Sequence, residues 1–145
     1  MAYEILDVKP SILDENLLSI LSPSIFNPTP ERLRSRAESY KENKNANIYA
    51  YRENGKYLGV VVFEICRTAA TICDIAVHSS CRGKGIGSCL IDFIFKEFSV
   101  ARINAETDDD AIGFYKKYGF IVSETFVKFD TVRYKCVCKS KAAEG

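Results

Sequence analysis

The segment from Asp74 to Ser88 constrains the fold more than any other part of the chain. It begins as an apolar strand pattern, passes through a basic turn that contains Gly83, Gly85 and Gly87, and continues as an amphipathic helix. The first turn of a helix presents backbone N–H groups without helical partners and a partial positive charge. Glycine allows a bound anion to approach such N–H groups closely. The sequence therefore predicts a strand, a phosphate-binding turn and a helix in succession.

The overall charge is too close to zero for the whole surface to bind anions. There are 20 basic and 19 acidic side chains, which give a net charge of +1 over 145 residues. This balance excludes a nucleic-acid coat or a membrane-surface binder. The length predicts one domain, which we assign to residues 1–138, followed by a C-terminal tail at 139–145. No apolar run approaches the roughly 20 residues that cross a bilayer, and we expect no secretion signal at residues 1–4.

The six cysteines indicate a reducing, cytoplasmic setting. None of them forms a Cys-x-x-Cys pair, and Cys66, Cys73 and Cys89 lie in apolar strand or helix patterns, where a free thiol behaves as a small hydrophobe. Cys136 and Cys138 lack the usual ligand spacing of a zinc site. We therefore expect no metal.

Hydrophobic periodicity predicts a mixed α/β (α+β) domain. A helix over 86–98 between strands at 70–77 and 101–105 implies that these two strands run parallel. Asn54-Gly55 predicts a hairpin turn. In order, we expect a strand, two helices, three strands, a helix, a strand, a helix and two strands, which gives a mostly antiparallel sheet of about six to seven strands with about four helices. The other elements are expected at 3–8, 13–21, 29–43, 48–51, 57–65, 108–118, 120–129 and 131–138, and the acidic run Asp108-Asp109-Asp110 is expected to open the helix at 108–118.

Three other interpretations of the glycine-rich turn fit the residues less well. A turn that only reverses the chain would not need the basic pair Arg82 and Lys84. A Walker loop ends in Gly-Lys-Ser/Thr, whereas Gly87 is followed directly by serine. A dinucleotide-binding fold is favoured by Glu106, an acid about 20 residues further on. Against that fold, the glycines are spaced wrongly for Gly-x-Gly-x-x-Gly, and the chain lacks the further helical crossovers of a parallel sheet.

Two motifs together resemble the GNAT acetyltransferase family. The run Ile75-Ala76-Val77-His78, followed by Arg82-Gly83-Lys84-Gly85-Ile86-Gly87, resembles the family's coenzyme A motif, Gln/Arg-x-x-Gly-x-Gly/Ala. The stretch from Ala111 to Phe120 is similar to its Ala-Ile-x-x-Tyr-x-x-x-Gly-Phe segment. The two motifs occur in the family's order and at its usual separation, and residues 57–61 resemble its third strand. The resemblance covers about residues 45–138, whereas the first 45 residues match only in the order of their elements.

The resemblance implies a site for acetyl-CoA. The two central parallel strands, which end at Val77 and near Glu106, would splay apart and admit the thioester. The backbone from Arg82 to Gly87 would bind the pyrophosphate, and the strand at 75–77 would pair with the pantetheine arm. The implied cofactor-binding residues are Ile75, Ala76, Val77, Arg82, Gly83, Lys84, Gly85, Ile86, Gly87 and Ser88. The family often has asparagine where this chain has Asp108, which is expected to cap a helix instead.

The implied chemistry is direct attack of a neutral amine on the thioester in a ternary complex. A backbone N–H near Val77 would stabilise the oxyanion, an effect worth about 3 kcal/mol for one good donor. Tyr115 matches the family position of the general acid that protonates the departing thiolate, and its reference pKa of about 10 keeps it protonated at neutral pH. The alternative is that Tyr115 only packs within the apolar stripe of its helix. Tyr118 is the second candidate for the donor.

The general base is left open among three strand carboxylates: Glu64, Asp74 and Glu106. Each could instead be a solvated or paired strand residue, and the base could act through water. The single histidine, His78, is interpreted as a polar residue at the end of a strand beside the phosphate loop.

The acceptor is expected to be a primary amine of a small molecule or peptide. It would lie against the first two helices, the segment 22–29 and the last hairpin, where Phe26 and Tyr40 could line its site or simply pack. We expect a monomer or homodimer with no nucleic-acid or membrane partner. The alternatives are a non-catalytic module that binds coenzyme A and a dinucleotide-binding enzyme.

Overall fold

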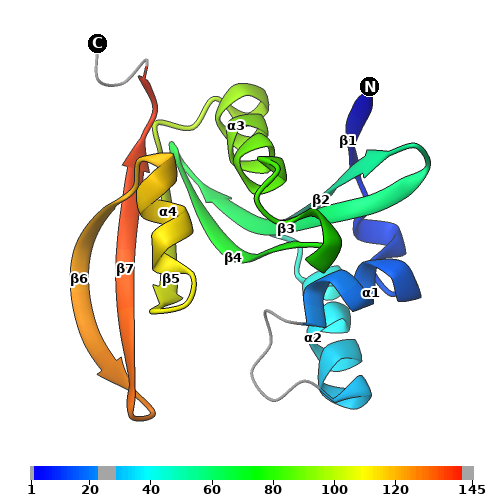
Figure 1. Cartoon of the computed structure of the whole chain (residues 1–145), viewed down its shortest axis with the longest axis horizontal. Coiled ribbons are helices and arrows are strands. Elements are labelled where there is room, and N and C mark those ends of the chain that lie inside the picture. Colours follow the sequence, from blue (N-terminus) through cyan, green and yellow to red (C-terminus); the bar gives the residue numbers. More distant parts are fainter. Residues whose placement is uncertain (1, 23–28, 142–145) are drawn as a thin grey trace. The chain divides into compact units, whose positions relative to one another are not determined.

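The protein, described here as a computed structural model of residues 2–22 and 29–141, is built on a mixed seven-stranded sheet (Figure 1). The strand order is β1-β2-β3-β4-β5-β7-β6. The pairs β1–β2, β2–β3, β5–β7 and β6–β7 are antiparallel, and β4–β5 is parallel. The predicted order of strands and helices is confirmed. The strands are β1 (Tyr3–Asp7), β2 (Ala46–Glu53), β3 (Lys56–Cys66), β4 (Ala69–Val77), β5 (Arg102–Asp108), β6 (Ile121–Lys128) and β7 (Thr131–Lys139).

The helices begin largely where the sequence places their caps. They are α1 (Glu15–Leu21), α2 (Pro30–Glu42), α3 (Ile86–Phe98) and α4 (Ile112–Tyr118), with short 3-10 turns η1 (Lys9–Ser11) and η3 (Ser79–Cys81). The Thr29 hydroxyl accepts a hydrogen bond from the Arg32 N–H (3.1 Å), so the predicted start of α2 is confirmed. The α4 helix starts only after the acidic run that was expected to open it. There, Asp108 Oδ1 accepts hydrogen bonds from the Asp110 and Ala111 N–H groups, each at 3.1 Å, and forms a turn ahead of the helix.

The chain forms two compact units, described separately: Met1–Glu64 with Cys73–Phe93, and Ile65–Ile72 with Ile94–Gly145. In the first unit, alternation along β3 sends neighbouring residues to opposite faces of the sheet. Val60 and Val62 belong to the core cluster that includes residues of α1 and α2. Gly59 faces Ile86 on α3. The helices α1 and α2 therefore cover one face of these strands and α3 covers the other (Figure 1).

Two of the tight hairpin turns lie where the sequence places them. Asn54 and Gly55, between β2 and β3, adopt φ angles of 53° and 75°, as the Asn-Gly turn predicts. In the second unit, Phe129 and Asp130 turn β6 into β7 with φ angles of 51° and 60°. The parallel register of β4 and β5 also lies within this unit and pairs Ala69–Thr71 with Arg102–Asn104.

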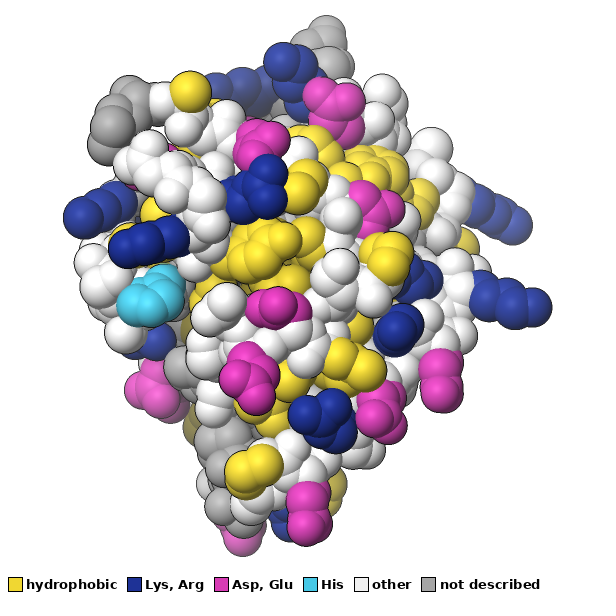
Figure 2. Space-filling view, turned by 90° about the vertical axis from the view of Figure 1, so that its right-hand side faces the viewer, with side chains coloured by type: hydrophobic (Ala, Val, Ile, Leu, Met, Phe, Trp, Pro, Cys, Tyr) yellow, Lys and Arg dark blue, Asp and Glu magenta, His cyan; other side chains and the backbone are white. Residues whose placement is uncertain are grey.

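On the face drawn in Figure 2, acidic and basic side chains are interspersed around patches of hydrophobic ones, in agreement with the net charge of +1. Within the described ranges, no helix combines the length and the apolar character needed to cross a membrane.

Candidate active site

The segment after β4 forms an exposed loop fixed at its start by His78. The His78 N–H donates to the Leu58 carbonyl of β3 at 2.8 Å. Its Nδ1 accepts from the Ser80 N–H (3.2 Å) and lies 2.8 Å from the Ser80 hydroxyl. His78 is therefore the cap of η3, which agrees with its interpretation as a polar residue at the end of a strand.

The glycines of this loop are required by backbone conformation. Gly83 and Gly85 have φ angles of 81° and 84°, a region that side chains other than glycine rarely adopt. A Cβ at either position would meet nothing within 4 Å. The space beside the backbone is therefore open at both glycines, as close approach of an anion would need.

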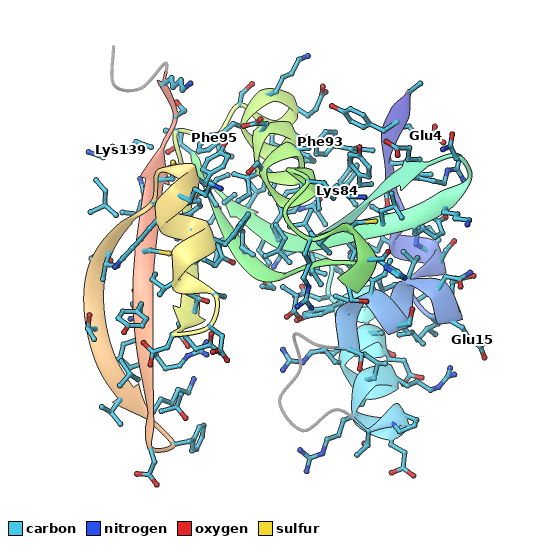
Figure 3. All side chains as sticks on the ribbon, viewed as in Figure 1. Glu4, Glu15, Lys84, Phe93, Phe95 and Lys139 are labelled. Atoms are coloured by element: carbon cyan, nitrogen blue, oxygen red, sulfur yellow. The ribbon has the colours of Figure 1, made fainter. Side chains whose placement is uncertain are left out.

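The loop carries two basic residues, Arg82 and Lys84, and leads directly into the first turn of α3. Residues 82–85 are exposed, and the Cys89 N–H donates to the Gly85 carbonyl at 3.0 Å, which closes the first turn of α3. The N–H groups in such a turn have no helical acceptor. Lys84 lies where the loop enters α3 (Figure 3). Together with Arg82 it would oppose the charge of a bound phosphate.

Asp74 is a buried carboxylate on β4 in the same unit. The residue is 9% exposed. Its Oδ2 accepts a hydrogen bond from the Tyr40 hydroxyl of α2 and lies 3.8 Å from Arg36 Nη1. Arg36 Nη1 also donates to the Tyr40 hydroxyl at 3.1 Å. Burial, and next the charge of Asp74, raise the pKa of Tyr40, so its hydroxyl keeps the proton that it donates.

Glu64 lies on β3 in the same unit and is half-buried. Its Oε1 accepts from Asn43 Nδ2 at 3.1 Å and lies 4.0 Å from Cys73 Sγ. Burial, and next the charges of Glu64 and Asp74, raise the pKa of the Cys73 thiol to about 11. Two of the three candidate bases therefore lie in one unit, near residues from the C-terminal half of α2.

Glu106 belongs to the second unit and has a different environment. It is exposed on β5, and its Oε2 lies 3.2 Å from both Nε and Nη2 of Arg133 on β7. Arg133 Nη1 also lies 3.8 Å from Asp108 Oδ2. An exposed carboxylate in an ion pair matches the alternative of a paired strand residue.

Tyr115 lies on α4 in the second unit and is 5% exposed. Its ring packs edge-on against Phe114 and Phe120, with centroids 5.2 and 5.0 Å away. The packing holds the ring in one orientation, which suits either a fixed proton donor or a core residue. Tyr118 is half-buried and packs at 5.8 Å against Phe120.

The remaining predicted residues lie as follows. Ile75, Ala76 and Val77 are half-buried at the C-terminal end of β4, whereas Ile86 and Gly87 are buried and Ser88 is half-buried in the first turn of α3. Phe26 falls outside the described residues. Tyr40 was expected only to line the acceptor region or to pack, and its bond to Asp74 was missed. Arg36, Asn43 and Arg133 carry no motif, so nothing in the sequence indicates their contacts beyond the helical spacing of Arg36 and Tyr40.

The mostly antiparallel sheet, with helix α3 between its two parallel strands, defines a class of acyltransferases. The chain belongs to the GNAT acetyltransferases: residues 44–122, more than half of it, match the acetyltransferase (GNAT) domain. The matched segment contains the loop, the three candidate bases and Tyr115.

Individual proteins resemble this chain in sequence or in structure. The chain is 35% identical over 79 residues to the UPF0157 protein YqkA of Bacillus subtilis, covering 52% of this chain and 23% of that protein. It is 36% identical over 62 residues to the uncharacterized N-acetyltransferase ycf52 of Pyropia yezoensis, covering 41% of this chain and 36% of that protein. The chain thus spans about a third or less of these relatives. The structure of an aminoglycoside 6'-N-acetyltransferase complexed with coenzyme A superposes with a TM-score of 0.79 at 15% identity, over 96% of this chain and 97% of the other.

Proposed function

We propose that this chain is a single acetyltransferase domain that transfers an acetyl group from acetyl-CoA to a primary amine of a small molecule or peptide. The observation that carries the proposal is the loop that precedes α3. Gly83 and Gly85 adopt positive φ angles in it, and the exposed basic residues Arg82 and Lys84 lie beside them, just before the first turn of the helix. The membership of the chain in the GNAT family supports it. The mostly antiparallel sheet argues against the dinucleotide-binding alternative, which requires a parallel one.

The residues of the first unit fit a bound diphosphate. The open space beside Gly83 and Gly85 would admit phosphate oxygens, and Arg82 and Lys84 would offset their charge. The backbone of residues 75–77 would hold the pantetheine arm. When bound, acetyl-CoA supplies an activated thioester and a thiolate leaving group.

In this proposal Asp74 receives the acceptor amine. Primary amines are mostly protonated at neutral pH, because an unperturbed alkylammonium such as that of lysine has a pKa of about 10.4. The ammonium must lose a proton before its nitrogen can act as a nucleophile. A carboxylate held by Tyr40 in a buried site binds that cation and takes the proton, directly or through water. Glu64, whose Oε1 accepts a hydrogen bond from the neutral amide of Asn43, is the second candidate.

The acceptor would lie along the α1 and α2 side of the first unit. A shallow hollow there is lined partly by Leu18 and Leu33, with Glu15 and Arg34 at its charged positions. Such a surface can hold an apolar part and a polar part of a small molecule or peptide. Tyr115 would protonate the departing thiolate, as the family motif implies.

The proposal is tested by incubating the protein with acetyl-CoA and a broad panel of amines, from amino acids and polyamines to aminoglycosides and peptide N-termini. Because the protein carries six free cysteines, thiol release is measured at catalytic protein concentration and confirmed by the mass of the acetylated acceptor. We expect turnover of at least one class of amine.

Two other results would favour the alternative functions. Tight binding of coenzyme A without turnover of any amine would favour the non-catalytic module. Stabilisation of the fold by NAD and not by acetyl-CoA would favour the dinucleotide enzyme, because a ligand that binds only the native state raises the melting temperature. Size-exclusion chromatography with light scattering in the same buffer would decide between monomer and homodimer.

A further inference from the structure

One face of α2 supplies two side chains, one helical turn apart, to a single carboxylate of β4. Tyr40 donates a hydrogen bond to Asp74 Oδ2, and Arg36 Nη1 lies 3.1 Å from the Tyr40 hydroxyl and 3.8 Å from the same Oδ2. The Arg36 guanidinium also lies 5.9 Å from the centre of the Tyr40 ring. The three side chains form a connected chain from a half-exposed cation to a buried anion.

We infer that Tyr40 and Arg36 are positioning residues that keep the Asp74 carboxylate ionised and fix its orientation toward the acceptor amine. The inference rests on the proposed function for the role of Asp74. It adds a part of the site that the family match at residues 44–122 does not include, because both residues precede it.

The charges around Asp74 explain why such support is needed. Burial alone disfavours an ionised carboxylate. Glu64 on β3 and Asp74 both act on Cys73 of β4, so Glu64 is a like charge in the same region. Cys73, whose pKa is raised to about 11 by burial and by these two charges, stays neutral at physiological pH. Two groups that favour the anion come from α2: the Tyr40 hydroxyl, by a charge-assisted hydrogen bond, and the Arg36 guanidinium, by its charge.

The two residues contribute unequally. Tyr40 is 8% exposed and contacts Oδ2 directly, so its hydrogen bond is shielded from water. The Arg36 side chain is 46% exposed and its ion pair is long, so solvent and salt screen its charge. Tyr40 should therefore have the larger effect on the protonation of Asp74, and only the effect of Arg36 should weaken strongly with ionic strength.

The test compares Tyr40→Phe with Tyr51→Phe. Tyr51 is a matched control because it is also buried and its hydroxyl donates to a carboxylate, Glu53 Oε1, at 3.2 Å outside the proposed site. The first measurement is the pH dependence of kcat/KM for an acceptor found in the amine panel. The second is the titration of Asp74, followed by the NMR signal of its carboxyl carbon. That signal is assigned by its absence in the Asp74→Asn variant.

We expect Tyr40→Phe to raise the pKa of Asp74, and with it the acid limb of the rate profile, by about one pH unit, because a donor to the charged form is lost. Tyr51→Phe should leave both unchanged. Arg36→Ala should cause a smaller rise that disappears in high salt, with Arg32→Ala as its control on the same helix.

Superimposable Asp74 titrations in Tyr40→Phe and wild type would overturn the inference. The NMR titration does not require activity, so a protein that acetylates no amine would refute the proposed function while the titration still decides the role of Tyr40. If Tyr40→Phe shifts the Asp74 titration but not the rate profile of an active enzyme, Asp74 is not the group that accepts the proton, and the inference fails as well.

Discussion

Gly59 on β3 lies directly against Ile86, the first residue of α3. A Cβ at Gly59 would come within 2.8 Å of Ile86 Cγ2, 3.3 Å of Leu90 Cδ1 and 3.4 Å of the Ala76 carbonyl oxygen. The absence of a side chain on one strand therefore sets how closely the loop-bearing helix and the end of β4 can approach the sheet. The same helix start carries the proposed phosphate site.

Gly59→Ala is expected to destabilise the protein and to weaken binding of coenzyme A. The new methyl group must push α3 away from β3, and overpacking of this kind costs about 1–3 kcal/mol in the free energy of unfolding. Urea denaturation and calorimetric titration with coenzyme A measure the two effects. Gly113→Ala is the control, because Gly113 is an exposed residue of α4 whose Cβ would meet nothing within 4 Å. Equal stability of Gly59→Ala and wild type would contradict the packing argument.

Gly85→Ala is expected to weaken coenzyme A binding more than tenfold while the core stays folded. The φ angle of 84° strains any residue with a Cβ, and the relaxed loop would withdraw its N–H groups from the anion. Gly55→Ala provides the control, because Gly55 has a similar φ of 75° in the β2–β3 turn. This substitution should lower the stability of the protein without changing its affinity for coenzyme A. Unchanged affinity in a folded Gly85→Ala variant would show that the loop only reverses the chain.

Much of the fold could be predicted because its signals are local. The Asn54-Gly55 turn, the Thr29 cap and the helical stripe of α3 each lie within a few residues of the structure they specify. The start of α4 was placed too early, since the Asp108 carboxylate satisfies two N–H groups in a turn before the helix begins. Local acidity alone does not distinguish these two arrangements.

The partners of the candidate carboxylates could not be predicted, because they are distant in the sequence. Tyr40 precedes Asp74 by 34 positions, and Arg133 follows Glu106 by 27. The hydrophobic pattern of the sequence placed all three carboxylates on strands, but it did not indicate which of them is the general base. Burial and pairing distinguish the three carboxylates only once the positions of α2 and of the strands are known.

Two of the candidate bases, Asp74 and Glu106, should differ in their effect on turnover. Asp74→Asn is expected to lower kcat about 100-fold or more, the usual contribution of a general base. Glu106→Gln should change it by less than about threefold, because Glu106 is exposed and paired with Arg133. The variants are compared by their steady-state rates at saturating acceptor and acetyl-CoA. The affinity of each variant for coenzyme A shows that it is folded. A larger loss in Glu106→Gln than in Asp74→Asn would reverse the assignment.

Tyr115→Phe separates the two interpretations of Tyr115. Phenylalanine keeps the ring contacts with Phe114 and Phe120, so the fold and the affinity for coenzyme A should change little. If the hydroxyl protonates the departing thiolate, kcat falls by about 100-fold where chemistry limits the rate. Single-turnover measurements establish that condition, and Tyr118→Phe, on the same helix, controls for loss of a nearby hydroxyl. Equal single-turnover rates for wild type and Tyr115→Phe would mean that Tyr115 acts only through packing and that the thiolate leaves without a proton from this residue.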